Sequence, residues 1–198
     1  VQAQMGTRFP LLGQDALGMR VLVPQQGADG SAVLVEGLIF AGARDAVEGD
    51  LPCTPRTVLT QAFRALGEPY AWGGSRGGMF GRDCSRLVMD AYAVTGVRLP
   101  RNTSQQAAAC RAVVTFDGDL AADERRALLV GRVPVGAILT MPGHVMLYLG
   151  ALDGEPFIIH ATQSSGYDGV VVSDLSLGAG TEAGRLLDRL ASAVVVSG

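Results

Sequence analysis

Histidine and cysteine are scarce in this chain of 198 residues, which has two histidines and three cysteines. The net charge of −3 gives no excess of basic residues, so nucleic acid is excluded as an expected partner. No apolar run reaches the ~18 consecutive residues of a membrane-spanning helix, and we expect no membrane span. The chemistry therefore has to come from a small set of side chains.

Length and turn composition predict two parts. Apolar runs at residues 19–23, 32–35 and 37–41 are short and separated by turn residues, which is typical of a small β module. Residues 50–56 contain two prolines and are interpreted as a linker. We expect the β module over residues 1–50 and a larger domain over 51–198, with a β extension of that domain as the alternative.

Cys84 differs from the other cysteines in its surroundings. The glycine-rich residues 73–81 precede it, and residues 85–94 carry apolar side chains at helical spacing. This pattern places Asp83 at the N-cap and Cys84 in the first turn of a helix. Because the start of a helix favours an anion, we expect a lowered thiol pKa and a nucleophilic Cys84.

Both histidines lie next to strand-like apolar runs downstream of Cys84. His144 precedes residues 145–149 and His160 closes residues 156–159, and both runs are too short for a typical helix. A nucleophilic thiol needs an imidazole base, and that base needs a third group to orient it. We expect Cys84, His144 and His160 to supply nucleophile, base and orienting group.

The alternatives for these residue types are structural or metal-binding roles. Cys53 and Cys110 are interpreted as buried apolar residues, with a disulfide between them left open. Zinc ligands usually occur in pairs a few residues apart, whereas Cys84, His144 and His160 are far apart in sequence. We therefore expect no metal site.

The remaining patterns predict an α+β fold. Helices are expected at residues 57–66, 84–95, 103–113 and 185–190, with a short surface helix within 115–132. Strands are expected at residues 135–140, 145–149, 157–160, 169–173 and 193–197, the first four forming an antiparallel meander.

These motifs together resemble the NlpC/P60 family of bacterial cell-wall peptidases, from about residue 57 to the end of the chain. The matching positions are Tyr70, Trp72, Asp83, Cys84, Ser85, residues 99–107, His144, Tyr148 and His160. The resemblance implies a papain-like α+β domain with helices packed on an antiparallel sheet. In it, Cys84 attacks, His144 serves as base and acid, and His160 orients His144. No cofactor is implied.

The same resemblance implies a substrate and a location. The family's usual reaction is hydrolysis of the γ-D-glutamyl–diamino acid bond in peptidoglycan stem peptides. Tyr70, Asp83 and Ser85 resemble the groups that hold the substrate's free amino terminus, and Trp72 and Arg86 are further candidates for substrate binding. The β module resembles a bacterial SH3-like domain. The expected location is the cell envelope, periplasmic or extracellular. The start at Val1, without an initiator methionine or a signal peptide, is interpreted as a mature or trimmed product.

Two positions depart from the family pattern. Arg86 stands where glycine is usual, and Gly136-Ala137 stands where a Gly-Asp pair is usual. A long cation next to the nucleophile either helps to hold a thiolate or fills space that the substrate needs. Two other interpretations therefore stay open: a catalytically silent wall-binding member of the family, and a papain-like amidase or acyltransferase with another substrate.

Overall fold

The structure is a computed structural model that describes residues 3–43, 45–74, 81–164 and 166–196. Residues 75–80 of the glycine-rich stretch lie outside the described residues. The elements in chain order are β1 (Leu11–Asp15), β2 (Gly18–Gln26), β3 (Ala32–Phe40), α1 (Pro55–Arg64), α2 (Cys84–Ala93), α3 (Thr103–Ala108), β4 (Arg111–Thr115), α4 (Ala122–Arg132), β5 (Ile138–Met141), β6 (His144–Leu152), β7 (Glu155–Ser164), β8 (Tyr167–Asp174), α5 (Leu186–Arg189) and β9 (Ser192–Val195).

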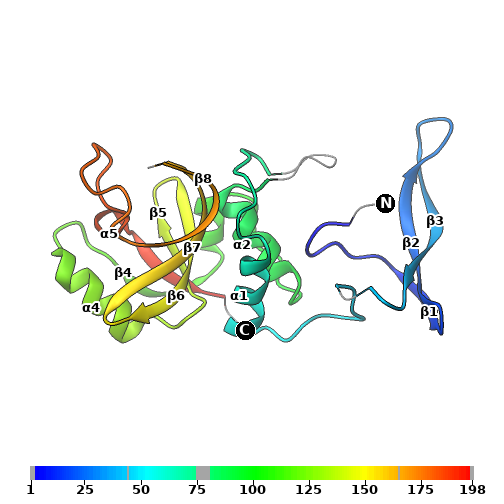
Figure 1. Ribbon diagram of the computed structural model, residues 1–198, viewed down its shortest axis with the longest axis horizontal. Helices are drawn as coiled ribbons and strands as arrows, with labels where there is room; N and C mark the ends of the chain where they lie inside the picture. Colours follow the sequence, from blue (N-terminus) through cyan, green and yellow to red (C-terminus); the bar gives the residue numbers. More distant parts are fainter. Residues whose placement is uncertain (1–2, 44, 75–80, 165, 197–198) are drawn as a thin grey trace.

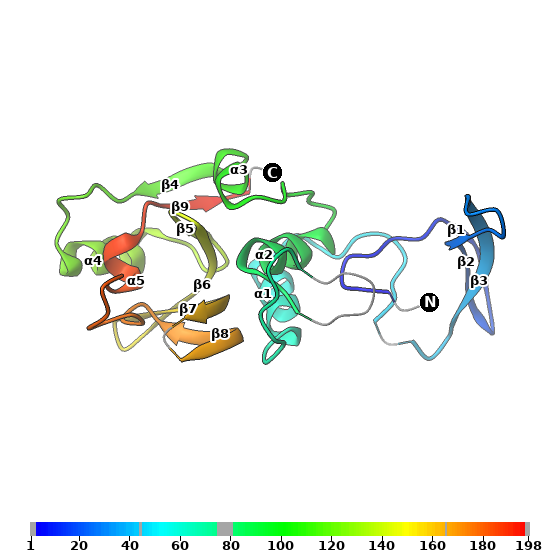
Figure 2. The ribbon, with the colours of Figure 1, turned by 90° about the horizontal axis from the view of Figure 1, so that it is seen from above.

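The strands form two separate antiparallel sheets. β1, β2 and β3 make a three-stranded sheet, and the others make a six-stranded sheet in the order β4-β9-β5-β6-β7-β8. The two sheets lie at opposite ends of the molecule, with α1 and α2 between them (Figures 1 and 2). The α+β architecture and the antiparallel meander are thus confirmed. Within the described residues, no helix is long and apolar enough to cross a membrane.

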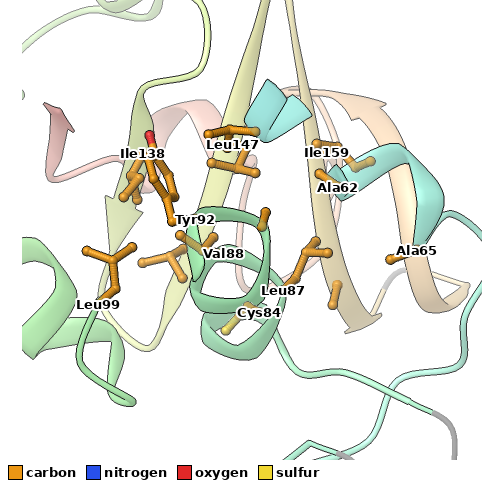
Figure 3. Close-up of a cluster of buried hydrophobic side chains, with 14 of the residues drawn as sticks. Ala62, Ala65, Cys84, Leu87, Val88, Tyr92, Leu99, Ile138, Leu147 and Ile159 are labelled. Atoms are coloured by element: carbon orange, nitrogen blue, oxygen red, sulfur yellow. The ribbon is translucent and has the colours of Figure 1, made fainter. Parts of the chain in front are cut away.

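The six-stranded sheet is covered on both faces. Ile138, Leu147 and Ile159 pack on one face with Val58 of α1 and Leu87 of α2 (Figure 3). The residues next to them in sequence, Leu139, Met146 and Ile158, pack on the other face with residues of α4 and α5. Because successive side chains of a strand point to opposite faces, burial of both faces requires continuous apolar runs. This explains why these strands lack polar alternation.

One predicted helix is wrong over half of its length. The helix expected at residues 103–113 ends at Ala108, and residues 111–115 form β4. β4 pairs with β9, so that Ala112 lies opposite Val194. The run Arg111–Thr115 contains two adjacent valines, which fit a strand well. Its partner β9 lies far away in sequence, and this tertiary pairing overrides the local helical pattern.

The small sheet also differs from expectation. β1 was not expected, and the runs at residues 32–35 and 37–41 belong to the single strand β3. Gly37 lies within β3, at a point where a Cβ would come within 2.9 Å of Val23 Cγ2. Glycine thus allows close packing inside the strand. The SH3-like assignment and the division at residue 50 stay predictions.

The segment before β1 contacts the larger part of the chain. Arg8 forms an ion pair with Asp50 and donates to the Ala93 carbonyl oxygen at 3.3 Å. The Gln4 side chain accepts from Arg86 Nη2 at 3.4 Å. After this segment, the chain runs away from α2 toward β1 (Figure 2). On the other side of the sheet, the Leu51 N–H donates to the Val94 carbonyl at 3.0 Å. Both ends of the small sheet therefore lead back to α2.

Candidate active site

Cys84 is the first residue of α2, as expected. Asp83 is the N-cap, and its carboxylate accepts from the Arg86 N–H at 2.8 Å. The thiol lies at the beginning of β6, where the Val145 N–H and the Thr103 hydroxyl both interact with the sulfur. Cys84 is 7% exposed and belongs to the core between α2 and the sheet (Figure 3). The thiol is therefore next to the backbone of the residue that follows His144.

The expected lowering of the thiol pKa is wrong for this structure. Burial raises the pKa of Cys84, the Val145 N–H opposes that shift, and the charge of Asp83 adds to it. The interactions available at the helix start stabilise the thiolate, but desolvation is the larger effect. The surroundings of Cys84 therefore favour the neutral thiol.

The two histidines are bonded to each other. His144 Nε2 lies 2.9 Å from His160 Nδ1, and the rings meet nearly edge to face with centroids 5.1 Å apart. His144 follows the Pro142–Gly143 turn, in which glycine takes a φ of +78° and so allows a short connection between β5 and β6. Among the described residues, no hydrogen bond uses Nδ1 of His144. That nitrogen is available to a substrate or to a thiol.

Burial keeps both imidazoles neutral. It lowers the pKa of His144 to about 4, with a smaller contribution from the positive charge of Arg189. It lowers the pKa of His160 to about 3, with His144 as the second cause. At neutral pH, each ring therefore has one N–H and one lone pair, which is the form in which an imidazole can take up a proton.

These shifts predict a loss of stability in mild acid. Between about pH 6.5 and 4, the unfolded chain protonates both histidines while the folded chain keeps them neutral, so stability falls as the pH falls. The expected loss at pH 5 is on the order of 1–2 kcal/mol for each histidine. Urea unfolding at pH 7, 6 and 5 measures it. Since the chain has only these two histidines, a free energy of unfolding that does not change over this range would contradict the prediction.

Asp83 is fully used as a hydrogen-bond acceptor. Its carboxylate accepts from the Gly73 N–H at 2.9 Å, from the Ser85 hydroxyl at 3.2 Å, from the Arg86 N–H and from Arg101 Nη2. Arg101 Nη1 also donates to Ser85 Oγ at 2.7 Å. Burial opposes ionisation of Asp83, but the Arg101 and backbone donors outweigh it and lower its pKa.

Tyr70 lies in the same neighbourhood. Residues 69–71 pair with Arg82, whose N–H donates to the Pro69 carbonyl oxygen at 3.1 Å. Burial raises the pKa of Tyr70, and the nearby acidic groups of Cys84 and Asp83 raise it further. The structure therefore brings Tyr70, Asp83 and Ser85 together near the thiol.

The last two candidates for substrate binding lie in different settings. Trp72 is 88% exposed, directly before the segment that is not described. Arg86 reaches along its own helix, and its Nε lies 2.8 Å from Asp90 Oδ1. Asp90 also binds Arg82, so the Arg86 guanidinium belongs to a partly buried charge cluster.

Three residues near the site were not singled out from the sequence. Arg101 binds Asp83, the Thr103 hydroxyl interacts with the Cys84 sulfur, and Ser173 Oγ lies 3.3 Å from His160 Nε2. Arg101 and Thr103 lie in the segment 99–107, which was noted only as a family motif. Ser173 gave no signal, because a serine in a strand has no distinguishing pattern.

The other cysteines are free thiols. Cys53 is exposed, so the expectation that it is buried is wrong, and Cys110 is partly buried. The reason is their positions: Cys53 precedes α1 in the connecting segment, and Cys110 follows the short helix α3. Within the described residues, no group of three or more histidine, cysteine, aspartate or glutamate side chains is placed to hold a metal ion.

Comparison with curated proteins gives relatives that are named as endopeptidases and peptidases. The chain is 34% identical over 125 residues to a bifunctional muramidase/DL-endopeptidase of Bacillus subtilis, covering 62% of this chain and 32% of that protein. It is 31% identical over 108 residues to a γ-D-glutamyl-L-lysine dipeptidyl-peptidase of Bacillus cereus, covering 54% and 30%. The chain thus spans about a third of the length of either relative.

Solved structures share the fold. An NlpC/P60 endopeptidase from Photobacterium damselae superposes with a TM-score of 0.70 at 18% identity, covering 89% of this chain and 46% of that one. An NlpC/P60 family protein from Bacillus cereus gives a TM-score of 0.61 at 21% identity, covering 96% and 54%. Residues 67–177, more than half of the chain, match the NlpC/P60 family. The chain therefore belongs to the NlpC/P60 family.

Proposed function

We propose that the chain is a cysteine endopeptidase that cleaves peptidoglycan stem peptides at the γ-D-glutamyl–diamino acid bond. The observation that carries this proposal is the Cys84 thiol at the start of α2, beside the N–H of Val145. Val145 directly follows His144, which is bonded to His160. The names of the two Bacillus relatives, a DL-endopeptidase and a γ-D-glutamyl-L-lysine dipeptidyl-peptidase, support this class of bond. Such a substrate implies that the chain works in the cell envelope.

In the proposed reaction, Cys84 and His144 act as nucleophile and base. His144 takes the thiol proton through Nδ1 as the sulfur attacks the γ-carbonyl carbon of D-glutamate. The tetrahedral intermediate expels the amine of the diamino acid, which receives the proton from His144. Water, deprotonated by His144, then hydrolyses the thioester and releases the γ-carboxylate and the free thiol.

His160 orients the base in this scheme. When His160 Nδ1 accepts a hydrogen bond from His144 Nε2, the proton of neutral His144 lies on Nε2 and its lone pair lies on Nδ1. The same bond stabilises the imidazolium that forms after proton transfer. The proposed role of His160 is therefore to fix both the rotation and the tautomer of His144.

Digestion of defined muropeptides tests the proposal. The purified chain is incubated with a stem tetrapeptide that begins with a free L-alanine, and the fragments are identified by mass. We expect one fragment that ends at D-glutamate and a second that begins with the diamino acid, and neither in a Cys84→Ala control. Cleavage at another bond, or no cleavage of any muropeptide, would overturn it.

We further propose that Tyr70, Asp83 and Ser85 bind the free amino terminus of the substrate, with Trp72 at the edge of the site. A carboxylate next to two hydroxyls suits an ammonium group. Arg101 already binds Asp83 and Ser85, so the ammonium has to share that carboxylate with a guanidinium. Arg86 is not placed in this amine site, because Asp90 holds its guanidinium.

This arrangement predicts a preference for unblocked peptides. We expect a peptide that begins with free L-alanine to be cleaved about ten- to a hundredfold faster than its N-acetylated form, since a charge-assisted hydrogen bond contributes about 1.5–3 kcal/mol. Asp83→Asn should abolish the preference, because asparagine keeps the helix cap but lacks the charge. The measurement is kcat/KM on both peptides.

Arg101→Gln serves as the matched comparison. This variant keeps a donor for Ser85 but removes the competing cation, so we expect the preference for the free amine to increase. Equal rates on free and blocked peptides in the natural chain and in Arg101→Gln would remove the amine site from the proposal while leaving the catalytic residues in place.

A further inference from the structure

The hydrogen bonds of the histidine pair extend to a third side chain. Ser173 of β8 lies with Oγ 3.3 Å from His160 Nε2, and His160 is 1% exposed. Ser173 pairs with Ile158 of β7 in the sheet register, two residues before His160. Side chains two residues apart in a strand point to the same face, so Ser173 and His160 are diagonal neighbours across two strands.

The directions of these two hydrogen bonds determine which nitrogen of each histidine carries the proton. If Ser173 accepts from His160 Nε2–H, then His160 Nδ1 carries the lone pair and accepts from His144 Nε2–H. His144 then has its own lone pair on Nδ1. If the directions are reversed, His144 carries a proton on Nδ1 and cannot act as a base at that atom.

We propose that Ser173 is a positioning residue that holds His160 in the Nε2–H tautomer and thereby keeps His144 in its basic form. This inference rests on the proposed function of His144. Among the described residues, Ser173 is the one hydrogen-bond partner of His160 Nε2. Burial of an N–H without an acceptor costs about 1–3 kcal/mol. The Ser173 oxygen removes this penalty from the Nε2–H tautomer, because it can accept from that N–H.

Removal of the Ser173 hydroxyl should therefore reverse the direction of the hydrogen bond between His160 and His144. In Ser173→Ala, the Nε2–H of His160 would be buried without an acceptor, so the ring is expected to move its proton to Nδ1 and donate to His144. An unprotonated Nε2 left without a donor is the less costly arrangement. Ser173→Thr keeps the hydroxyl, and threonine fits a strand well.

The test combines nitrogen NMR of the imidazoles with kinetics in Ser173→Ala and Ser173→Thr. Ser164→Ala is the matched control, because Ser164 lies on β7 and bonds the Thr162 hydroxyl rather than a histidine. We expect His144 to show protonated Nε2 in the natural chain, Ser173→Thr and Ser164→Ala, and protonated Nδ1 in Ser173→Ala. On the muropeptide, kcat should fall at least about tenfold in Ser173→Ala, with KM unchanged and with most activity restored by threonine.

The NMR readout separates this inference from the proposed function. Identical tautomers of both histidines in the natural chain and in Ser173→Ala would overturn the role of Ser173, whatever the activity. Loss of activity in Ser173→Thr as large as in Ser173→Ala would overturn it as well, because the hydroxyl would then not matter. A third outcome is possible: Ser173→Ala shifts the tautomer, but the natural protein cleaves no muropeptide. This outcome would keep the role of Ser173 and remove the peptidase assignment.

Discussion

We expect Cys84→Ala to lower kcat/KM on a defined muropeptide by at least about a thousandfold, because the change removes the sulfur that attacks the carbonyl carbon. The fold should survive, since the thiol is small and lies at the end of the helix rather than in its middle. Circular dichroism and thermal unfolding verify this. Cys84→Ser provides a near-isosteric variant with a much weaker nucleophile.

The other cysteines supply the controls for this prediction. Cys53→Ala and Cys110→Ala change a thiol outside the site and should keep the activity of the natural chain. Full activity of Cys84→Ala, or its loss in either control, would reassign the nucleophile.

The second large effect is expected at the histidines, and it differs between them. His144→Ala should lower kcat by about 10²–10⁴-fold, because no other imidazole can take and return the proton. His160→Ala should cost less, since nucleophile and base both stay in place. The measurement is kcat of the two folded variants on the same muropeptide, which shows which histidine contributes more.

His160→Asn makes this comparison sharper. An asparagine side chain offers a carbonyl oxygen that can accept from His144 Nε2, so it should keep more activity than alanine if the role of His160 is to orient. Asparagine that is no better than alanine would show that His160 contributes something other than an acceptor. Equal tolerance of His144→Ala and His160→Ala would exclude both from catalysis.

The parts of the site that could be predicted from the sequence are those with a local signal. Asp83 and Cys84 follow a glycine-rich segment and precede a helical pattern, which marks a helix start without any tertiary information. His144 and His160 lie at the ends of apolar runs. Local sequence patterns were thus enough to predict a thiol at a helix start and two imidazoles at the ends of strands.

The parts that could not be predicted depend on distant partners. β4 pairs with β9, and neither strand indicates this pairing in its own residues. Ser173 reaches His160 because β7 and β8 pair in a particular register. A register shift of one residue would place the Ser173 side chain on the other face of the sheet. The raised pKa of the Cys84 thiol follows from burial, whereas the sequence showed only the helix start that opposes it.

The double connection of the small sheet to α2 determines how that sheet can be removed. A truncation that starts at residue 51 deletes Gln4 and Arg8 as well, although both contact the larger part of the chain. The small sheet is thus flanked on both sides in the sequence by segments that contact α2, as an inserted module is. Because Arg8 and Asp50 are ion-paired, the two ends of the insertion are adjacent, and a short glycine bridge can join them. Such an excision isolates the contribution of the sheet, which simple shortening of the chain does not.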